Sequence, residues 1–270
     1  MSKVVFITGA SSGIGKAIGE YLHSKNYKVY GTSRNPSTVR ETLPFELLPM
    51  DVTQQETILS TVSSILSKEG RIDVLVNNAG VGITGPIEET PTPEIKKAFE
   101  TNFYGPLEVI KAVLPTMRTQ NEGLIINITS IAGYMGLPYR GIYSATKAAL
   151  EITAEAYRME VKPFGIRMTN VAPGDFATNI ASGRYHAPIR EDSPYKKTYS
   201  ETLHMMNEHV SGGGDPLEMA KAIHDIIETQ NPKVHYRVGS GLQKLSVLLK
   251  KFLSDKRYEK MLMKHYKLKG

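Results

Sequence analysis

Tyr143 and Lys147 are the two residues whose types and spacing best fit a chemical role. They lie four positions apart in the run Tyr-Ser-Ala-Thr-Lys-Ala-Ala-Leu, and in a helix this spacing places a phenol and an ammonium on one face. A nearby positive charge favours the phenolate and lowers the pKa of a tyrosine from its solution value of about 10. Tyr143 is therefore a candidate proton donor and acceptor near neutral pH, as the interconversion of an alcohol and a carbonyl requires. Alone the signal is weak, because many helices carry a packed Tyr and a solvated Lys at this spacing.

The segments around this pair alternate between strand-like and helix-like patterns, which is typical of a parallel sheet covered by helices. Strands are expected at residues 3–8, 28–33, 45–50, 74–77, 123–129, 166–171 and 235–238. Helices are expected at residues 13–25, 53–68, 93–117 and 143–162, with another starting at Asp215-Pro216. With no repeat or linker to divide the chain, the pattern predicts one α/β domain over residues 1–270, a doubly wound Rossmann-like fold with about seven parallel strands.

A glycine-rich loop is expected where the first strand meets the first helix. The sequence there is Thr8-Gly9-Ala10-Ser11-Ser12-Gly13-Ile14-Gly15. Glycines let the backbone turn tightly and approach a pyrophosphate, which binds at the positive end of the helix. This spacing differs from the common dinucleotide fingerprint, so the position between strand and helix is what favours a nucleotide site over a plain turn.

The composition is that of an ordinary globular protein, with 40% apolar and 22% charged residues among 270. The chain has no cysteine, which excludes disulfides and thiolate metal sites and favours a reducing compartment. The apolar run at residues 4–8 is too short for a signal peptide, so we expect a cytoplasmic protein. The histidines His186, His204 and His209 lack metal-ligand spacing, and no metal site is expected.

The net charge of +6 is concentrated at the end of the chain. Residues 233–270 hold 11 Lys and Arg against 2 Asp and Glu, a local charge of +9, so the remaining chain is −3. Nothing in that remainder resembles a nucleic-acid module, and we expect no nucleic-acid partner.

Together these motifs resemble the short-chain dehydrogenase/reductase family in its compact single-domain form. The resemblance covers residues 3–178, and it rests on the glycine loop, Asp51-Val52, Asn77-Asn78-Ala79-Gly80, Asn102, Ser130, Tyr143 with Lys147, and Pro173-Gly174 with Thr178. The order and spacing of these motifs are highly specific, and none of the positions departs from the family pattern. The resemblance implies that a nicotinamide cofactor is bound by Gly9, Ser11, Ser12, Gly13, Ile14, Gly15, Asp51, Val52, Asn78, Ala79, Gly80, Tyr143, Lys147, Pro173, Gly174 and Thr178.

The same resemblance implies a catalytic role for four side chains. Tyr143 would exchange a proton with the substrate oxygen, and Ser130 would hydrogen-bond that oxygen. Lys147 would lower the pKa of Tyr143 and bind the ribose hydroxyls of the cofactor, while Asn102 would hold a water that links Lys147 to solvent. Each residue alone has an ordinary structural explanation, but the four explanations are independent accidents that must coincide in this order.

The residues after the expected second strand bear on the choice between NADP and NAD. An enzyme that prefers NAD usually has an acid there to accept a hydrogen bond from the ribose 2′-hydroxyl. This chain has Ser33 and Arg34 instead, and a guanidinium suits a 2′-phosphate. We therefore expect NADP(H) as the preferred cofactor over NAD, unless Arg34 is only a solvated loop charge.

The long stretch at about residues 175–214 is expected to be a partly helical lid or substrate loop. Its Tyr and Met residues, with Tyr134, Met135 and Leu137, favour a lipophilic ketone, aldehyde or alcohol as substrate, although several could pack against the sheet or a second subunit. We expect a homodimer or homotetramer.

The tail at about residues 241–270 is basic and amphipathic. Its apolar stripe is Leu242, Leu245, Leu248, Leu249 and Phe252. Docking on the chain's own domain is the expectation, and peripheral contact with an anionic membrane is the alternative. The tail is also more similar to that of steroid- or retinol-type members of the family than to that of ketoacyl-carrier-protein reductases.

Two other function classes remain open. A binding protein that senses NADP(H) or serves as a scaffold could keep the fold without turnover. A nucleotide-sugar epimerase or dehydratase also uses a Tyr and a Lys four apart, but the short chain lacks a substantial C-terminal substrate domain.

Overall fold

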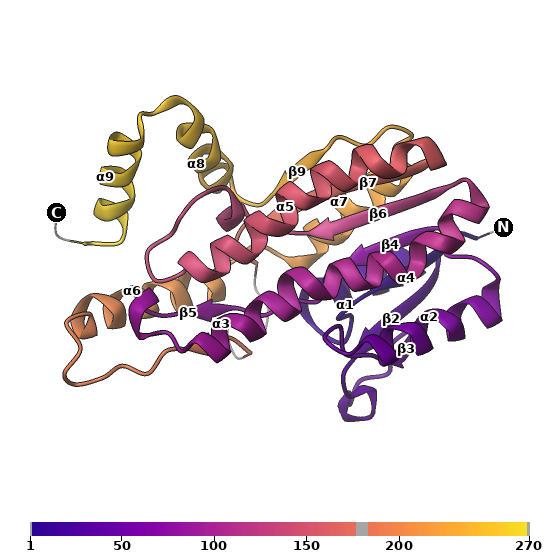
Figure 1. The fold of residues 1–270 in the computed structure, drawn as a ribbon, viewed down its shortest axis with the longest axis horizontal. Helices are drawn as coiled ribbons and strands as arrows, with labels where there is room; N and C mark the ends of the chain where they lie inside the picture. The colour runs from indigo at the N-terminus through magenta and orange to yellow at the C-terminus, as the bar shows by residue number, and fades with distance from the viewer. Residues whose placement is uncertain (1, 177–182, 269–270) are drawn as a thin grey trace.

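A seven-stranded parallel sheet forms the centre of the computed structural model, which describes residues 2–176 and 183–268 (Figure 1). The strand order is β3-β2-β1-β4-β6-β7-β9, and every neighbouring pair is parallel. The strands are β1 (Val4–Ile7), β2 (Lys28–Ser33), β3 (Glu46–Pro49), β4 (Val74–Asn77), β6 (Gly123–Ile128), β7 (Ile166–Pro173) and β9 (His235–Val238). This confirms the predicted doubly wound Rossmann-like fold.

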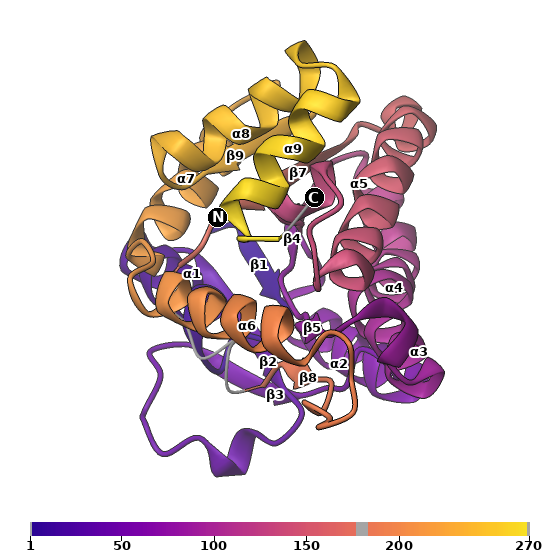
Figure 2. The same cartoon turned by 90° about the vertical axis from the view of Figure 1, so that its left-hand side faces the viewer.

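Helices cover both faces of the sheet, which explains why its central strands are continuous apolar runs instead of alternating ones. All residues of β1, β4 and β6 are buried. Figure 2 shows α4 and α5 on one side of the sheet and α1 and α7 on the other. The helices are α1 (Gly13–Ser24), α2 (Gln55–Glu69), α3 (Thr92–Phe99), α4 (Gly105–Gln120), α5 (Gly141–Val161), α6 (Lys196–Ser211), α7 (Pro216–Glu228), α8 (Gly241–Phe252) and α9 (Asp255–His265).

Three buried asparagines link the centre of the sheet to α5. Asn77, Asn127 and Asn170 lie side by side on β4, β6 and β7. Asn77 Nδ2 donates to Asn127 Oδ1 at 3.1 Å, and Asn127 Nδ2 donates to Asn170 Oδ1 at 3.3 Å. Asn170 Nδ2 then donates to the carbonyl of Glu151 in α5 at 3.0 Å. Because buried polar groups are costly unless paired, this chain of bonds fixes α5 relative to the strands.

The helix expected at residues 93–117 is interrupted. The structure has α3, then a π-helical segment (Glu100–Tyr104), then α4. The backbone at Gly105 lies close to Val52, in the segment that follows β3, since a Cβ on Gly105 would lie 2.9 Å from Val52 Cγ2. A π segment inserts extra backbone into a helix and often marks a functional site. Here it places the side chain of Asn102 inside the protein, fully buried.

The expected long loop contains both a strand and a helix. Strand β8 (Tyr185–His186) pairs with β5 (Ile83–Thr84), and α6 follows. The segment starts and ends at one point of the fold, because the amide of Gly214 donates to the carbonyl of Asp175 at 3.0 Å. Residues 177–182, which include Thr178, lie outside the described residues.

The tail folds as α8 and α9, which extend beyond the sheet at the upper left of Figure 1. Val247 and Tyr258 are buried against the segment after β6. The apolar stripe predicted to dock faces outward instead, with Leu242 81% and Phe252 79% exposed, and only Leu249 of that stripe packs inward. No described helix is long and apolar enough to cross a membrane.

Candidate active site

The glycine-rich loop crosses from β1 to the start of α1 at the point where the strand order reverses. Gly9 and Gly13 have φ values of +66° and +55°, in the left-handed region that glycine adopts without steric cost. A Cβ at Gly15 would lie 2.3 Å from the carbonyl oxygen of Gly9. The first turn of α1 has no acidic residue, and Ser12 does not cap it with its side chain. The amides of that turn are therefore available to an anionic ligand.

Hydrogen bonds attach this loop to the end of β4. Asn78 Nδ2 donates to the carbonyls of Thr8 at 3.0 Å and Gly9 at 2.8 Å. The hydroxyl oxygen of Thr8 accepts from the amides of Asn78 and Ala79, both at 3.0 Å. The loop geometry is thus set before any ligand binds, which lowers the entropic cost of binding.

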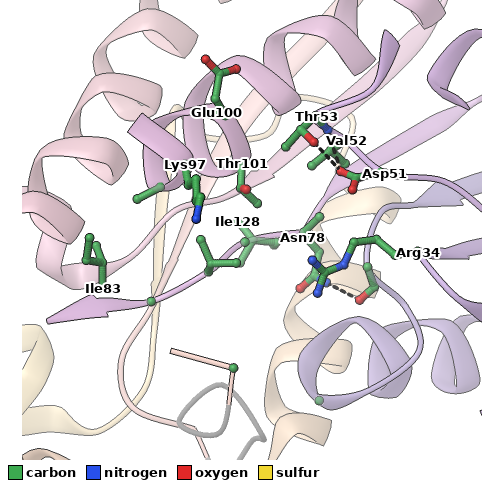
Figure 3. A pocket seen from close by; sticks show the side chains of 18 of the residues that line it. Arg34, Asp51, Val52, Thr53, Asn78, Ile83, Lys97, Glu100, Thr101 and Ile128 are labelled. Carbon is green, nitrogen blue, oxygen red and sulfur yellow. Dashed lines mark hydrogen bonds between the residues drawn. The ribbon is translucent and has the colours of Figure 1, made fainter. Parts of the chain in front are cut away.

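A cavity of about 810 Å³ opens along the carboxyl ends of the strands. Figure 3 shows Arg34, Asp51 and Thr53 at one side of it and Ile83 and Lys97 at the other. The predicted cofactor residues that line it are Gly9, Ser11, Ser12, Gly13, Ile14, Ser33, Arg34, Asp51, Val52, Asn78, Ala79, Gly80, Tyr143, Lys147 and Pro173. Gly15 supports the loop from α1, and Gly174 lines a second cavity.

Lys147 is buried at the base of the large cavity. Its Nζ donates to the carbonyl of Ile128 at 3.0 Å, so helix α5 is attached to the end of β6 through this side chain. Gly80 leaves room beside it, since a Cβ there would lie 3.4 Å from Lys147 Nζ and 3.2 Å from Asn102 Oδ1. One of the three ammonium donors is used by Ile128, which leaves two for a ligand.

A second cavity of about 70 Å³ contains Ser130 and shares Tyr143 with the large one. Ser130 caps the 3₁₀ turn η4 (Ile131–Tyr134), where its Oγ accepts from the amide of Ala132 at 3.1 Å. An accepting hydroxyl still has its own hydrogen to donate. Ser130 and Tyr143 are 13 positions apart in the sequence, and both line this one small cavity.

Asn102 lines neither cavity and instead holds the segment after β4. Its Oδ1 accepts from the amide of Val81 at 2.8 Å, and its Nδ2 donates to the carbonyl of Val81 at 2.9 Å. Nδ2 also donates to Thr146 Oγ1 at 3.1 Å, next to Lys147 on α5. The side chain therefore positions the backbone between the cavity and α5.

Replacing Asn102 with Ala should destabilise the protein by about 1–3 kcal/mol, because both polar groups of the Val81 backbone lose their buried partner. Urea unfolding measures the loss. Asn231→Ala, at an exposed position, is the matched control and should leave stability unchanged. Equal midpoints for Asn102→Ala and the unmodified chain would contradict this role.

The small cavity also contains two arginines that the sequence reasoning missed, Arg140 and Arg184. The guanidinium carbon of Arg140 lies 5.4 Å from the ring centroid of Tyr143, a cation–π geometry. Arg140 is the residue before α5, three positions ahead of Tyr143, and that spacing was the available signal. Arg184 gave no local signal, because only the β5–β8 pairing brings it here.

Comparison with known proteins assigns this architecture. A family model described as short chain dehydrogenase matches residues 3–188. The chain belongs to this family. The short-chain dehydrogenase is 39% identical over 254 residues to the 3-ketodihydrosphingosine reductase of Bacteroides thetaiotaomicron, with 94% of each chain covered. Family membership makes it an oxidoreductase and confirms the resemblance stated from the motifs.

Solved structures agree with this assignment. A short-chain dehydrogenase from Streptomyces avermitilis matches with a TM-score of 0.84 and 34% identity, covering 98% of this chain and 97% of that one. ElxO with NADP bound matches with a TM-score of 0.71 and 29% identity, covering 88% and 97%. A nicotinamide cofactor also fits the residues present here, since the glycine loop and Gly80 form a cradle that side chains would fill.

Proposed function

We propose that this short-chain dehydrogenase interconverts a carbonyl and a primary or secondary alcohol with NADP(H), using Tyr143 as general acid and base. One observation carries the proposal: Tyr143 lies where the two cavities meet, with Lys147 in the large cavity and Ser130 in the small one. A cofactor in the former and a substrate in the latter would therefore both reach the phenol.

The bound nicotinamide would supply or accept the hydride. Tyr143 would donate its phenolic proton to the carbonyl oxygen during reduction and take it back during oxidation. Ser130 would donate its hydroxyl hydrogen to the same oxygen, because the amide of Ala132 occupies it only as an acceptor. The free donors of Lys147 would bind ribose hydroxyls, and Asn102 would keep the adjoining backbone in place.

Arg34 supports the choice of NADP over NAD. It lines the large cavity beside Ser33 at the end of β2, where no acid stands. Ser33 Oγ accepts from the amide of Asn35 at 3.3 Å, so its hydrogen is available to a phosphate. Asp51 Oδ1 accepts from the amide and the hydroxyl of Thr53. These bonds orient the Asp51 carboxylate, which lines the same cavity as Arg34.

Arg34→Ala should raise KM for NADPH by about 10–100-fold, since a hydrogen bond to a charged group contributes about 1.5–3 kcal/mol. KM for NADH should stay unchanged. Initial rates with both cofactors measure this, and Arg40→Ala, an exposed arginine outside the cavity, is the control. Equal or better use of NADH by the unmodified enzyme would refute the assignment.

A lipophilic substrate is part of the proposal. Ile83 and Phe176 line the small cavity, and Tyr199 of α6 donates its hydroxyl to the carbonyl of Thr84, another lining residue, at 3.2 Å. The name of the Bacteroides relative, a 3-ketodihydrosphingosine reductase, is that of an enzyme for a lipid ketone, and it supports the apolar part of this substrate class and not the charge of the head group. A screen of ketones and alcohols, 3-ketodihydrosphingosine included, followed by absorbance of the reduced nicotinamide, tests this class.

A cytoplasmic homodimer or homotetramer completes the proposal. The absence of cysteine fits a reducing compartment. Ile152 and Met159, on the outer side of α5, are 68% and 70% exposed, and such side chains suit a contact between subunits. Light scattering of the purified protein tests the assembly, and a monomer at micromolar concentration would reject it.

A further inference from the structure

Two guanidinium groups line the small cavity that holds Ser130 and Tyr143. Arg140 stacks on the Tyr143 ring, and Arg184 lies on the wall formed by residues 82–84. Both arginines are half-buried. Positive charge is unusual in a cavity meant only for a neutral ketone, because removing a cation from water is costly without a counter-charge. The pair therefore needs a specific explanation.

Arg184 is held in place by backbone pairing. The amide of Tyr185 donates to the carbonyl of Gly82 at 3.0 Å, and the amide of Ala187 donates to the carbonyl of Thr84 at 2.8 Å. A Cβ at Gly82 would lie 2.8 Å from Arg184 Cγ, so the missing side chain makes room for the arginine stem. The site is thus shaped around Arg184.

The guanidinium of Arg184 has unused hydrogen-bonding capacity. Its Nη1 is buried and has no hydrogen-bond partner in the part of the chain that the structure describes. Burial lowers the pKa of Arg184, and the charge of Arg140 lowers it further. An arginine stays protonated at neutral pH, and an anion in the cavity that both side chains line would offset both costs.

Among the described residues, one acid lines the cavity, and it does not balance both arginines. Asp175 lines the cavity, and its Oδ2 accepts from Gln243 Nε2 of α8 at 2.9 Å. Tyr266, after α9, is buried beside Arg140, and burial raises its pKa, so it is a neutral neighbour. Two guanidinium groups against one carboxylate leave an excess positive charge at the substrate end.

We propose that Arg140 and Arg184 bind an anionic group of the substrate, a carboxylate or a phosphate ester, next to the carbonyl that Tyr143 protonates. This inference rests on the proposed function, and it names the substrate class: an amphiphile with an acidic group close to its ketone. Guanidinium forks bind both kinds of oxyanion through paired N–H donors.

A matched series of ketones tests the inference. At each spacer length, from one to four methylenes between the carbonyl and the terminal group, the members differ only in that group. It is a carboxylate, a phosphate ester, a neutral methyl ester or an amine. We expect the unmodified enzyme to have the highest kcat/KM for an anionic member and the lowest for the amine. Comparison of the carboxylate and phosphate members distinguishes the two oxyanions.

Variants assign the preference to the cavity. Arg184→Gln and Arg140→Gln should each lower the ratio of kcat/KM for the anionic ketone to kcat/KM for the neutral ester by about 10–100-fold. Arg190→Gln is the control, because this exposed arginine on the same segment pairs with Asp192 outside the cavity. Calorimetric binding of the corresponding carboxylate without a ketone, with NADPH present, should be lost in Arg184→Gln.

Three outcomes overturn the inference. One is an equal loss for anionic and neutral ketones, and another is a raised KM for NADPH in Arg184→Gln, which would place this arginine on the cofactor. The third is better turnover of the amine than of the ester. If one of these three outcomes is found and Tyr143→Phe still loses turnover, the inference fails and the proposed function stands. If the unmodified chain turns over no ketone at all, the proposed function itself is rejected.

Discussion

Tyr143→Phe should lower kcat by about 10²–10⁴-fold, because it removes the group that transfers the proton and leaves the ring in place. The affinity for NADPH should stay unchanged, since Lys147 and the glycine loop still line the large cavity. Steady-state absorbance at saturating ketone gives kcat, and fluorescence titration gives Kd. Tyr157→Phe is the matched control, a tyrosine on the same helix that packs in the core away from both cavities.

This variant also distinguishes the remaining function classes. A protein that only senses NADP(H) would bind the cofactor and show no carbonyl-dependent oxidation of NADPH, with or without Tyr143. Retention of most of kcat in Tyr143→Phe would instead mean that another group supplies the proton, and the proposed role of Tyr143 would be wrong.

Gly15→Ala should both weaken cofactor binding and destabilise the fold. The added Cβ would lie 2.3 Å from the carbonyl oxygen of Gly9 and 2.4 Å from Asn78 Nδ2, so the loop backbone must shift. Overpacking of this kind costs about 1–3 kcal/mol of stability. The shift also moves the amides that face the phosphates, and each 1.4 kcal/mol of lost binding raises Kd about tenfold.

Thermal unfolding without ligand and NADPH titration separate these two effects of Gly15→Ala. Gly136→Ala is the control, since nothing lies within 4 Å of its added Cβ. A variant that binds NADPH as tightly as the unmodified protein would show that the loop does not cradle the cofactor.

Local sequence patterns predicted the parts of the site that local geometry controls. Gly9 follows β1, and Gly13 and Gly15 lie in the first turn of α1. Gly9 and Gly13 have positive φ, and Gly15 has no room for a side chain, so each position requires glycine for a local reason. Tyr143 and Lys147 share one turn of α5, so a four-residue spacing was enough to place them together. The burial of every residue in β1 likewise follows from its unbroken apolar run.

Features that depend on contacts between distant segments could not be predicted. The π-helical segment that buries Asn102 results from its bonds to Val81 and from the close approach of Gly105 to Val52, neither of which is local in sequence. Arg184 reaches the cavity through strand pairing with residues about 100 positions earlier. Val247 is not part of the apolar stripe of the tail, yet it is the buried residue of α8. Only the tertiary structure shows this, because its partners lie in the segment after β6.

The amide of Gly214 donates to the carbonyl of Asp175, so the segment between them begins and ends at one point just after β7. Ser130, Tyr143 and Lys147 all precede it in the chain and are held by β6, η4 and α5. Because the two ends of the segment are hydrogen-bonded to each other, residues can be inserted or exchanged between them without moving the ends. The entropic cost of closing a loop rises only slowly with its length. Exchange of this segment, Arg184 included, would therefore change the lining of the small cavity and leave in place the elements that carry Ser130, Tyr143 and Lys147.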